Sequence, residues 1–71
     1  MKYVISEFGE VAVDGPFHAQ MARTLQGRVA AAGHYRISAD GTRVEVYGHS
    51  RGLHIQAKPE DAILIARHLG L

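Results

Sequence analysis

The central segment His34–Ala57 decides the fold, and it reads HYRISADGTRVEVYGHSRGLHIQA. Its apolar residues alternate with polar ones, and this period of two is typical of β-strands with one covered face. Two turn signals, Asp40-Gly41 and Ser50–Gly52, interrupt the alternation. The segment therefore predicts three consecutive antiparallel strands.

The two turns also predict how these strands pair. Asp-Gly is the preferred centre of a two-residue hairpin turn, so the turn at Asp40-Gly41 sets the register of the first two strands. We treat Ser50-Arg51 as a second two-residue turn. The pairs that follow from the first turn are Ala39 with Thr42, Arg36 with Glu45, and His34 with Tyr47. The pairs that follow from the second are His49 with Gly52, Tyr47 with His54, and Glu45 with Gln56.

One face of the predicted sheet gathers side chains that suit recognition. It carries arginines, imidazoles and an aromatic ring, which favour stacking on bases and contacts to phosphates, or an arginine-rich and tyrosine-rich protein interface. The alternative is a solvated face stabilised only by cross-strand pairs. The candidate binding residues are His34, Arg36, Arg43, Tyr47, His49, Arg51 and His54.

The flanking segments add a hairpin and two helices. Residues 3–14 hold two β-branched runs and predict a β-hairpin. From Pro16 the apolar residues recur every four positions, so we expect a helix over 16–32 with Gly33 as its C-terminal cap. Lys58-Pro59-Glu60-Asp61 opens a second helix, in which two early carboxylates complement the helix dipole.

Two features of these helices leave alternatives open. Gly27 costs about 1 kcal/mol relative to alanine inside a helix, so either another backbone passes close to it or the helix is weak there. The second helix is apolar on too many sides for a monomer of this size to cover, which predicts a homodimer or partner interface. Fraying with an exposed Leu64 is the alternative. The expected interface residues are Ile63, Leu64, Arg67 and His68.

These elements define a small single α+β domain over residues 1–71. Its order is a β-hairpin followed by α-β-β-β-α, with an antiparallel sheet and both helices on one sheet face. A chain of 71 residues is too short for a second core. Its stability is limited to roughly 3–5 kcal/mol, and without cysteine no disulfide adds to it.

Charge and hydropathy narrow the classes of function. The chain has a net charge of +1, but residues 16–58 carry +4 and four of the five histidines. Six of the eight basic residues are arginines, which favour bidentate contacts with carboxylate or phosphate. No apolar run approaches the roughly 20 residues of a membrane helix. We therefore expect a cytoplasmic protein that does not enter membranes.

The sequence contains no diagnostic catalytic or metal motif. Ser38 and Ser50 lack the glycine pattern of a nucleophile elbow or a phosphate loop. His49 and His54 lie diagonally in the predicted register, which is a poor start for a metal site. We expect no enzyme, no cofactor and no metal. Acid-base cleavage of RNA by His34 or His54 with Tyr47 stays open as an alternative.

The order of elements over residues 16–70 resembles the double-stranded-RNA-binding domain and the related HicA-type mRNA interferase toxins. Lys58-Pro59, the terminal Leu69-Gly70-Leu71 and Gly33-His34-Tyr35 are similar to segments of those toxins. The resemblance implies RNA binding or RNA cleavage. At the position of the toxins' Gly-Ser-His this chain has Gly41-Thr42-Arg43, so their catalytic histidine is missing. The paired lysines that open the last helix of the RNA-binding domains are missing too.

Together these features predict a small non-catalytic binding module. We expect an adaptor or inhibitor, of the kind that phages and mobile elements encode, which engages a larger protein or a ribonucleoprotein through the His/Arg/Tyr-rich sheet face. The alternatives are an RNA-binding domain and a HicA-like ribonuclease toxin. Salt separates protein binding from RNA binding, because RNA binding weakens steeply through counterion release.

Overall fold

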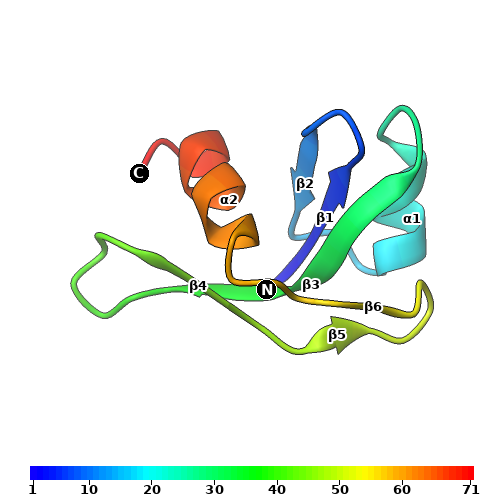
Figure 1. Cartoon of the computed structure of the whole chain (residues 1–71). Helices are drawn as coiled ribbons and strands as arrows, with labels where there is room; N and C mark the ends of the chain where they lie inside the picture. The colour runs from blue at the N-terminus through cyan, green and yellow to red at the C-terminus, as the bar shows by residue number, and fades with distance from the viewer.

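The long strand β3 (Val29–Ile37) runs through the centre of the protein (Figure 1), in a computed structural model that describes residues 1–71. The antiparallel sheet has the strand order β2-β1-β3-β4, and β5 and β6 form a separate two-stranded hairpin. This is the α+β class that the sequence predicts. The other elements are β1 (Lys2–Ser6), β2 (Val11–Val13), α1 (His18–Arg23), β4 (Val44–Tyr47), β5 (His49–Ser50), β6 (Ile55–Gln56) and α2 (Asp61–Leu69).

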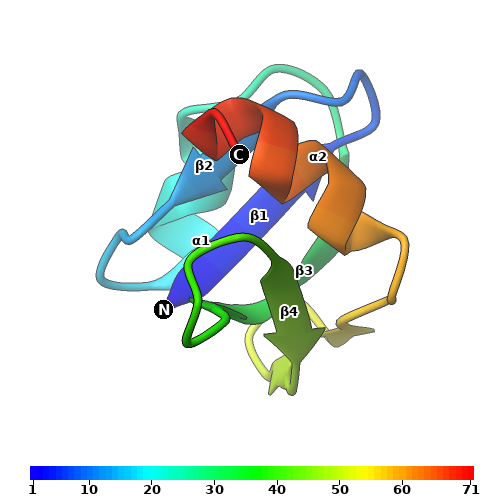
Figure 2. The same ribbon diagram turned by 90° about the vertical axis from the view of Figure 1, so that its left-hand side faces the viewer.

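The two helices cover opposite faces of the sheet, so the expectation that both lie on one face is wrong. Alternate residues of β1 enter two separate cores. Tyr3 and Ile5 pack with Ile65 of α2 in the α2-side core, whereas Val4 packs with Met21 of α1 in the α1-side core. Figure 2 shows α2 in front of β1 and α1 behind it. A central strand covered on both faces has no polar side, which explains why the apolar residues of β1 do not alternate with polar ones.

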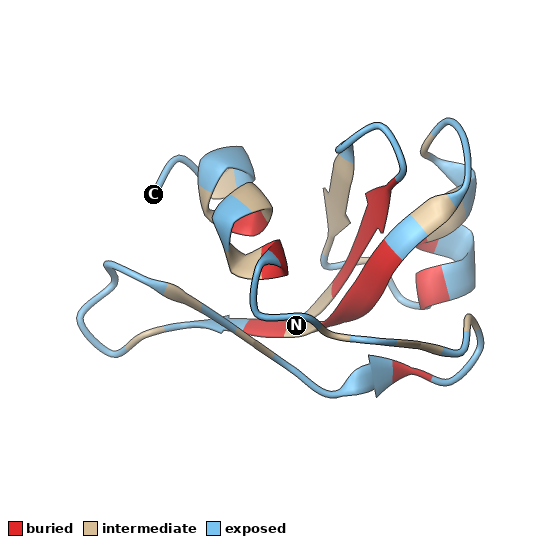
Figure 3. Ribbon diagram, in the orientation of Figure 1, coloured by how far each residue is buried: buried red, intermediate tan, exposed pale blue.

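The buried residues follow this arrangement. They concentrate along β1 and the middle of β3 (Figure 3). Leu53, in the β5–β6 loop, and Ile55, at the start of β6, pack against the α1-side core. Neither α1 nor α2, with six and nine residues, has the length and apolar character needed to cross a membrane.

The first helix is much shorter than predicted. α1 ends at Arg23, and residues 29–32 belong to β3 instead of to a helix over 16–32. Gly27 adopts φ +80°, and Glu7 binds Arg28 through both its backbone and its side chain. The chain therefore turns and joins β1. The period of four is misleading because Met21, Leu25 and Val29 pack against one core whether or not they are helical.

The first predicted hairpin register is confirmed, although its turn is wider than expected. His34 pairs with Tyr47 and Arg36 with Glu45, but the ladder ends at Ile37 and contains no pair between Ala39 and Thr42. In the loop that follows, the Asp40 carboxylate accepts hydrogen bonds from Ser38 and Thr42. These bonds lower the pKa of Asp40 to about 2.

The second predicted register is wrong. Gly48, at φ +72°, ends β4 and turns the chain away, so β5 and β6 pair only with each other. The observed pairs are His49 with Gln56 and Ser50 with Ile55, around a four-residue loop. The predicted pairs of His49 with Gly52, Tyr47 with His54, and Glu45 with Gln56 do not form.

Two buried tyrosines anchor the α2-side core to carboxylates. The Tyr3 hydroxyl donates to Asp61 at 2.5 Å, and the Tyr35 hydroxyl donates to Asp14 at 2.9 Å. Burial and the Asp61 carboxylate raise the pKa of Tyr3 well above its ordinary value. Burial and the Asp14 carboxylate raise the pKa of Tyr35 to about 12. Both hydroxyls therefore stay protonated and act as donors at neutral pH.

The lack of a side chain at Gly33 lets β3 pack closely against the segment that leads from β6 to α2. A Cβ at this position would lie 2.7 Å from the Ala57 Cβ and 3.2 Å from the Tyr47 carbonyl oxygen. We expect Gly33→Ala to destabilise the protein by roughly 1–3 kcal/mol, measured by urea unfolding. Gly52→Ala is the matched control, because a Cβ there meets nothing within 4 Å. Equal stability of the two variants would contradict this packing.

Candidate functional site

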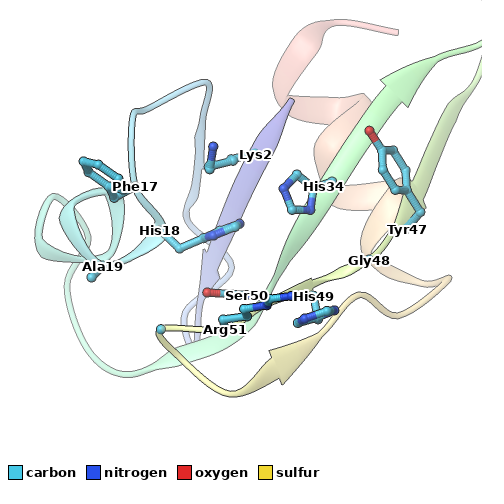
Figure 4. Close-up of a pocket in the computed structure, with 11 residues that line it drawn as sticks. Lys2, Phe17, His18, Ala19, His34, Tyr47, Gly48, His49, Ser50 and Arg51 are labelled. Atoms are coloured by element: carbon cyan, nitrogen blue, oxygen red, sulfur yellow. The ribbon is translucent and has the colours of Figure 1, made fainter.

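A cavity of about 610 Å³ opens on the α1 side of the sheet, between the start of α1 and the β5 segment (Figure 4). Segments far apart in the chain meet here: β1, the start of α1, β3, the end of β4, and β5 with its turn. We call this cavity the cationic pocket. Its lining is Lys2, Phe17, His18, Ala19, His34, Tyr47, Gly48, His49, Ser50, Arg51 and Gly52.

The pleat of the sheet and one glycine position the side chains of the pocket. Lys2 and His34 are paired across β1 and β3 and point to the same face as the α1-side core. The register of β3 with β4 brings Tyr47 beside His34. Gly48 then turns the chain, and a Cβ there would lie 3.0 Å from the His34 Nδ1. This turn brings β5 to the pocket.

A row of planar groups runs along one wall of the cationic pocket. The His18 and His34 rings meet edge to face at 5.3 Å, and His34 stacks on Tyr47 at 5.6 Å and 24°. Beyond Tyr47, the Arg36 guanidinium lies 5.8 Å from the ring centroid and pairs with Glu45 at 3.2 Å. Tyr47 remains 48% exposed and Phe17 64% exposed, so both rings are available to a ligand.

The orientation of His18 is fixed by the backbone of β3. Its Nε2 donates a hydrogen bond to the Gly33 carbonyl oxygen at 2.7 Å, so Nε2 carries the proton in the neutral ring. Nδ1 is then the atom with a free lone pair. No buried side-chain polar atom in the protein lacks a partner, and Nδ1 makes no hydrogen bond. Nδ1 is therefore accessible from solvent even though His18 as a whole is only 8% exposed.

Positive groups in the pocket have no negative partner. Its eleven lining residues include Lys2, Arg51 and three histidines but no carboxylate. The one ion pair in the protein, Arg36 with Glu45, lies outside the lining. The backbone N–H groups of Arg51 and Gly52 donate to no other atom of the protein. A concave lining with two unpaired cations and no carboxylate is the kind of site that attracts anions.

The pKa of His34 reflects this accumulation of positive charge. It lies below its ordinary value of 6.5, first because burial penalises the imidazolium and then because His18, the N-terminus, Lys2 and His49 repel a further positive charge. His34 is therefore neutral at pH 7. A bound anion would offset the repulsion and favour proton uptake.

The seven predicted binding residues separate into three places. His34, Tyr47, His49 and Arg51 line the cationic pocket, and Arg36 stacks on its outer rim. Arg43 lies exposed near the far end of the β3–β4 hairpin, outside the pocket. His54 lies in the β5–β6 loop and lines a second groove. The predicted row that places His54 beside Tyr47 is therefore wrong.

Sequence reasoning missed seven of the eleven lining residues, and the chemically important ones among them are Lys2, Phe17, His18 and Ser50. The first three precede the segment on which the predicted site rests. Their only signal is weak: His18 and Lys2 are polar residues that interrupt otherwise apolar segments. Ser50, which is 1% exposed, looks like a turn residue in the sequence.

The expected interface residues of α2 have different environments. Ile63 is 59% exposed, and Arg67 and His68 are exposed too. Leu64 packs, half-buried, against the α2-side core, so part of the apolar surface attributed to an interface is covered within the chain. The homodimer stays a prediction, and Ile63 is the residue that tests it best.

Comparisons with models of protein families, with curated proteins and with solved structures find no match to this chain. The geometry of the cationic pocket therefore provides the argument for function.

The pH dependence of anion binding follows from His34. Below about pH 6.5 an unfolded histidine takes up a proton while the folded, ligand-free His34 resists it, so the free protein loses stability as the pH falls. Sulfate in the pocket would oppose that loss. We expect the melting temperature in sulfate to exceed that in chloride, at equal ionic strength, by a margin that widens from about pH 8 to about pH 5.

The control for this experiment is His34→Asn, which keeps the general stabilising effect of sulfate but removes the linked proton. A margin that stays constant with pH in the wild type would contradict the link between His34 and anion binding.

Proposed function

We propose that this protein is a small binding module that holds a phosphoryl group of a larger ligand in the cationic pocket. The observation that carries the proposal is a concave site with Lys2 and Arg51 unpaired and no carboxylate among its eleven lining residues. Arginine, lysine and free backbone N–H groups are the usual donors to phosphate oxygens. The proposal keeps the predicted binding role, and the predicted cytoplasmic location, and adds a ligand class.

The aromatic rim supports a ligand that carries a planar group next to its phosphoryl group. Phe17 and Tyr47 expose much of their rings, and His34 stacks behind Tyr47. Stacking on such rings contributes roughly 1–3 kcal/mol per base in nucleic-acid complexes. Phenyl phosphate is therefore a suitable minimal probe, because it combines one phosphoryl group with one ring.

Isothermal titration calorimetry with phenyl phosphate tests this function. We expect saturable binding with one site per chain, competition by inorganic phosphate, and no binding of phenol at the same concentration. Binding of phenol as tight as that of phenyl phosphate would instead mean an apolar cleft, and the absence of any saturable heat with phenyl phosphate would refute the proposal.

A second candidate function is phosphoryl transfer, and His18 favours it. An imidazole that donates from one nitrogen to a backbone carbonyl and leaves its other nitrogen without a hydrogen bond meets the geometric requirement for a nucleophile. In this reaction Nδ1 forms a bond to phosphorus while the bond from phosphorus to the ester oxygen breaks. The oxygen leaves with the electron pair and takes a proton from solvent. Water then attacks phosphorus, releases inorganic phosphate and restores His18.

Release of nitrophenol from p-nitrophenyl phosphate distinguishes the two candidates. Phosphoryl transfer predicts turnover that His18→Asn abolishes, with binding of phenyl phosphate retained. If the wild type binds phenyl phosphate and releases no nitrophenol over its blank, the protein only binds the group.

A further inference from the structure

A second groove adjoins the cationic pocket across β5. It has a volume of about 550 Å³ and is lined by His49, Ser50, Arg51, His54, Ile55 and Gln56. Three of these residues, His49, Ser50 and Arg51, line the cationic pocket as well, so β5 and its turn form a common wall between the two. A ligand that leaves the pocket over β5 enters this groove directly.

The residues that line the second groove have the same chemical character as those that line the cationic pocket. It also contains an arginine and imidazoles and no carboxylate, and only Ile55 of its six residues is apolar. Neither Arg51 nor the two histidines have an ion-pair partner. His54 is held at φ +57°, a backbone conformation that residues other than glycine adopt uncommonly. The loop thus keeps an imidazole in the groove despite an unfavoured conformation.

We propose that the phosphoryl group in the cationic pocket belongs to a single-stranded nucleic acid, and that the next phosphate along its backbone lies in the groove lined by Arg51 and His54. This inference rests on the proposed function. Two adjoining sites without a carboxylate suit a ligand with regularly repeated anions. The exposed rings of Phe17 and Tyr47 supply the stacking surfaces that single-stranded ligands use.

A phosphopeptide fits the second groove less well. Its phosphoryl group would occupy the cationic pocket, and the peptide that follows would be mostly neutral. The groove would then leave His49 and His54 without an anion, and it offers a single apolar residue to a peptide side chain. The regional charge agrees with a polyanion, since residues 16–58 carry +4 in a chain of net charge +1.

Competition binding with ligands of increasing length tests the inference. The probes are inorganic phosphate, 5′-phosphorylated oligouridylates of one, two and four nucleotides, and a phosphoserine peptide with neutral flanks. We expect an affinity gain of at least about tenfold from one to two nucleotides, because one more charge-assisted contact forms. We also expect this gain to shrink as salt rises.

Variants in the second groove should remove the gain in affinity from one to two nucleotides without weakening binding in the cationic pocket. His54→Asn tolerates the left-handed backbone, and Gln56→Ala is a second groove variant that leaves His54 in place. Both are expected to bind the mononucleotide as the wild type does and to lose most of the gain with length. His68→Ala, in the last turn of α2, is the control that should lose nothing.

The outcomes separate this inference from the proposed function. If the mononucleotide and the tetranucleotide bind equally, or if the phosphopeptide binds as tightly as the tetranucleotide, the inference is overturned while phosphoryl binding stands. If neither inorganic phosphate nor the mononucleotide binds, the proposed function itself fails.

Discussion

Arg51→Glu is expected to weaken the binding of phenyl phosphate by at least about 100-fold. The change removes a cation that can donate to the phosphoryl oxygens, and each such charged hydrogen bond contributes about 1.5–3 kcal/mol. It also introduces a carboxylate into a pocket that contains none. Because a tenfold change in affinity corresponds to about 1.4 kcal/mol, the two effects together weaken the affinity for phenyl phosphate by more than about 100-fold. Titration calorimetry measures the difference directly.

Arg43→Glu provides the matched control for this experiment. It makes the same change in net charge, but Arg43 lies near the end of the β3–β4 hairpin, outside the pocket lining. We expect its affinity for phenyl phosphate to fall by less than about threefold through long-range electrostatics, which salt screens. Equal losses in the two variants would mean that phosphate responds only to the net charge of the protein.

Asp61→Ala is expected to destabilise the protein by about 3 kcal/mol. The Asp61 carboxylate is 5% exposed and accepts hydrogen bonds from the buried Tyr3 hydroxyl and from the Lys58 N–H. Its loss leaves two donors without a partner at the start of α2, and each unsatisfied buried group costs about 1–3 kcal/mol. A domain of this size has only roughly 3–5 kcal/mol to lose, so much of the population would unfold.

Urea unfolding followed by circular dichroism measures this effect. Glu60→Ala is the control, because Glu60 is exposed and its side chain makes no capping hydrogen bond. The double variant Tyr3→Phe with Asp61→Ala should be less destabilised than the sum of its parts, since it removes donor and acceptor together. A midpoint for Asp61→Ala equal to that of Glu60→Ala would refute a structural role for this pair.

The parts of the fold that local signals determine could be predicted from the sequence. The hairpin of residues 3–14 forms as β1 and β2, and a second helix follows Lys58-Pro59-Glu60-Asp61 as predicted. This helix begins only at Asp61, so its first turn holds one carboxylate instead of the expected two. Asp40-Gly41 gave the correct register for His34 and Tyr47, because the neighbouring strands extend evenly from that turn. The ion pair of Arg36 with Glu45 follows from the same register.

Contacts between distant segments determine two features that the sequence does not predict, the early end of the first helix and the break in the strand at Gly48. The first helix stops because residues 29–34 pair with β1 and Arg28 pairs with Glu7 just beyond it, and no local pattern around Gly27 reveals that partner. The strand break at Gly48 depends on its left-handed backbone, which a glycine permits but does not require. The break at Gly48 explains why the predicted row of His54 with Tyr47 does not form.

Four of the eleven lining residues of the candidate site were predicted, and the same physical reason explains the rest. His34, Tyr47, His49 and Arg51 lie in one continuous segment, whose alternation shows them on a polar face. Lys2 and His18 join them only because α1 and α2 cover opposite faces and leave this corner of the α1 side open. The placement of the helices on opposite faces depends on which apolar residues of β1 face which helix. Tyr3 and Ile5, which face α2, and Val4, which faces α1, form one continuous apolar run in the sequence.

Nuclear magnetic resonance of the backbone amides during a titration with inorganic phosphate tests the central claim most directly. If the cationic pocket binds the phosphoryl group, the amide signals of Lys2, His18, His34, Arg51 and Gly52 shift together and saturate, while those of Ile63 and Arg67 on α2 stay in place. Shifts spread evenly over all basic residues without saturation, or no shifts at the pocket, would contradict the account.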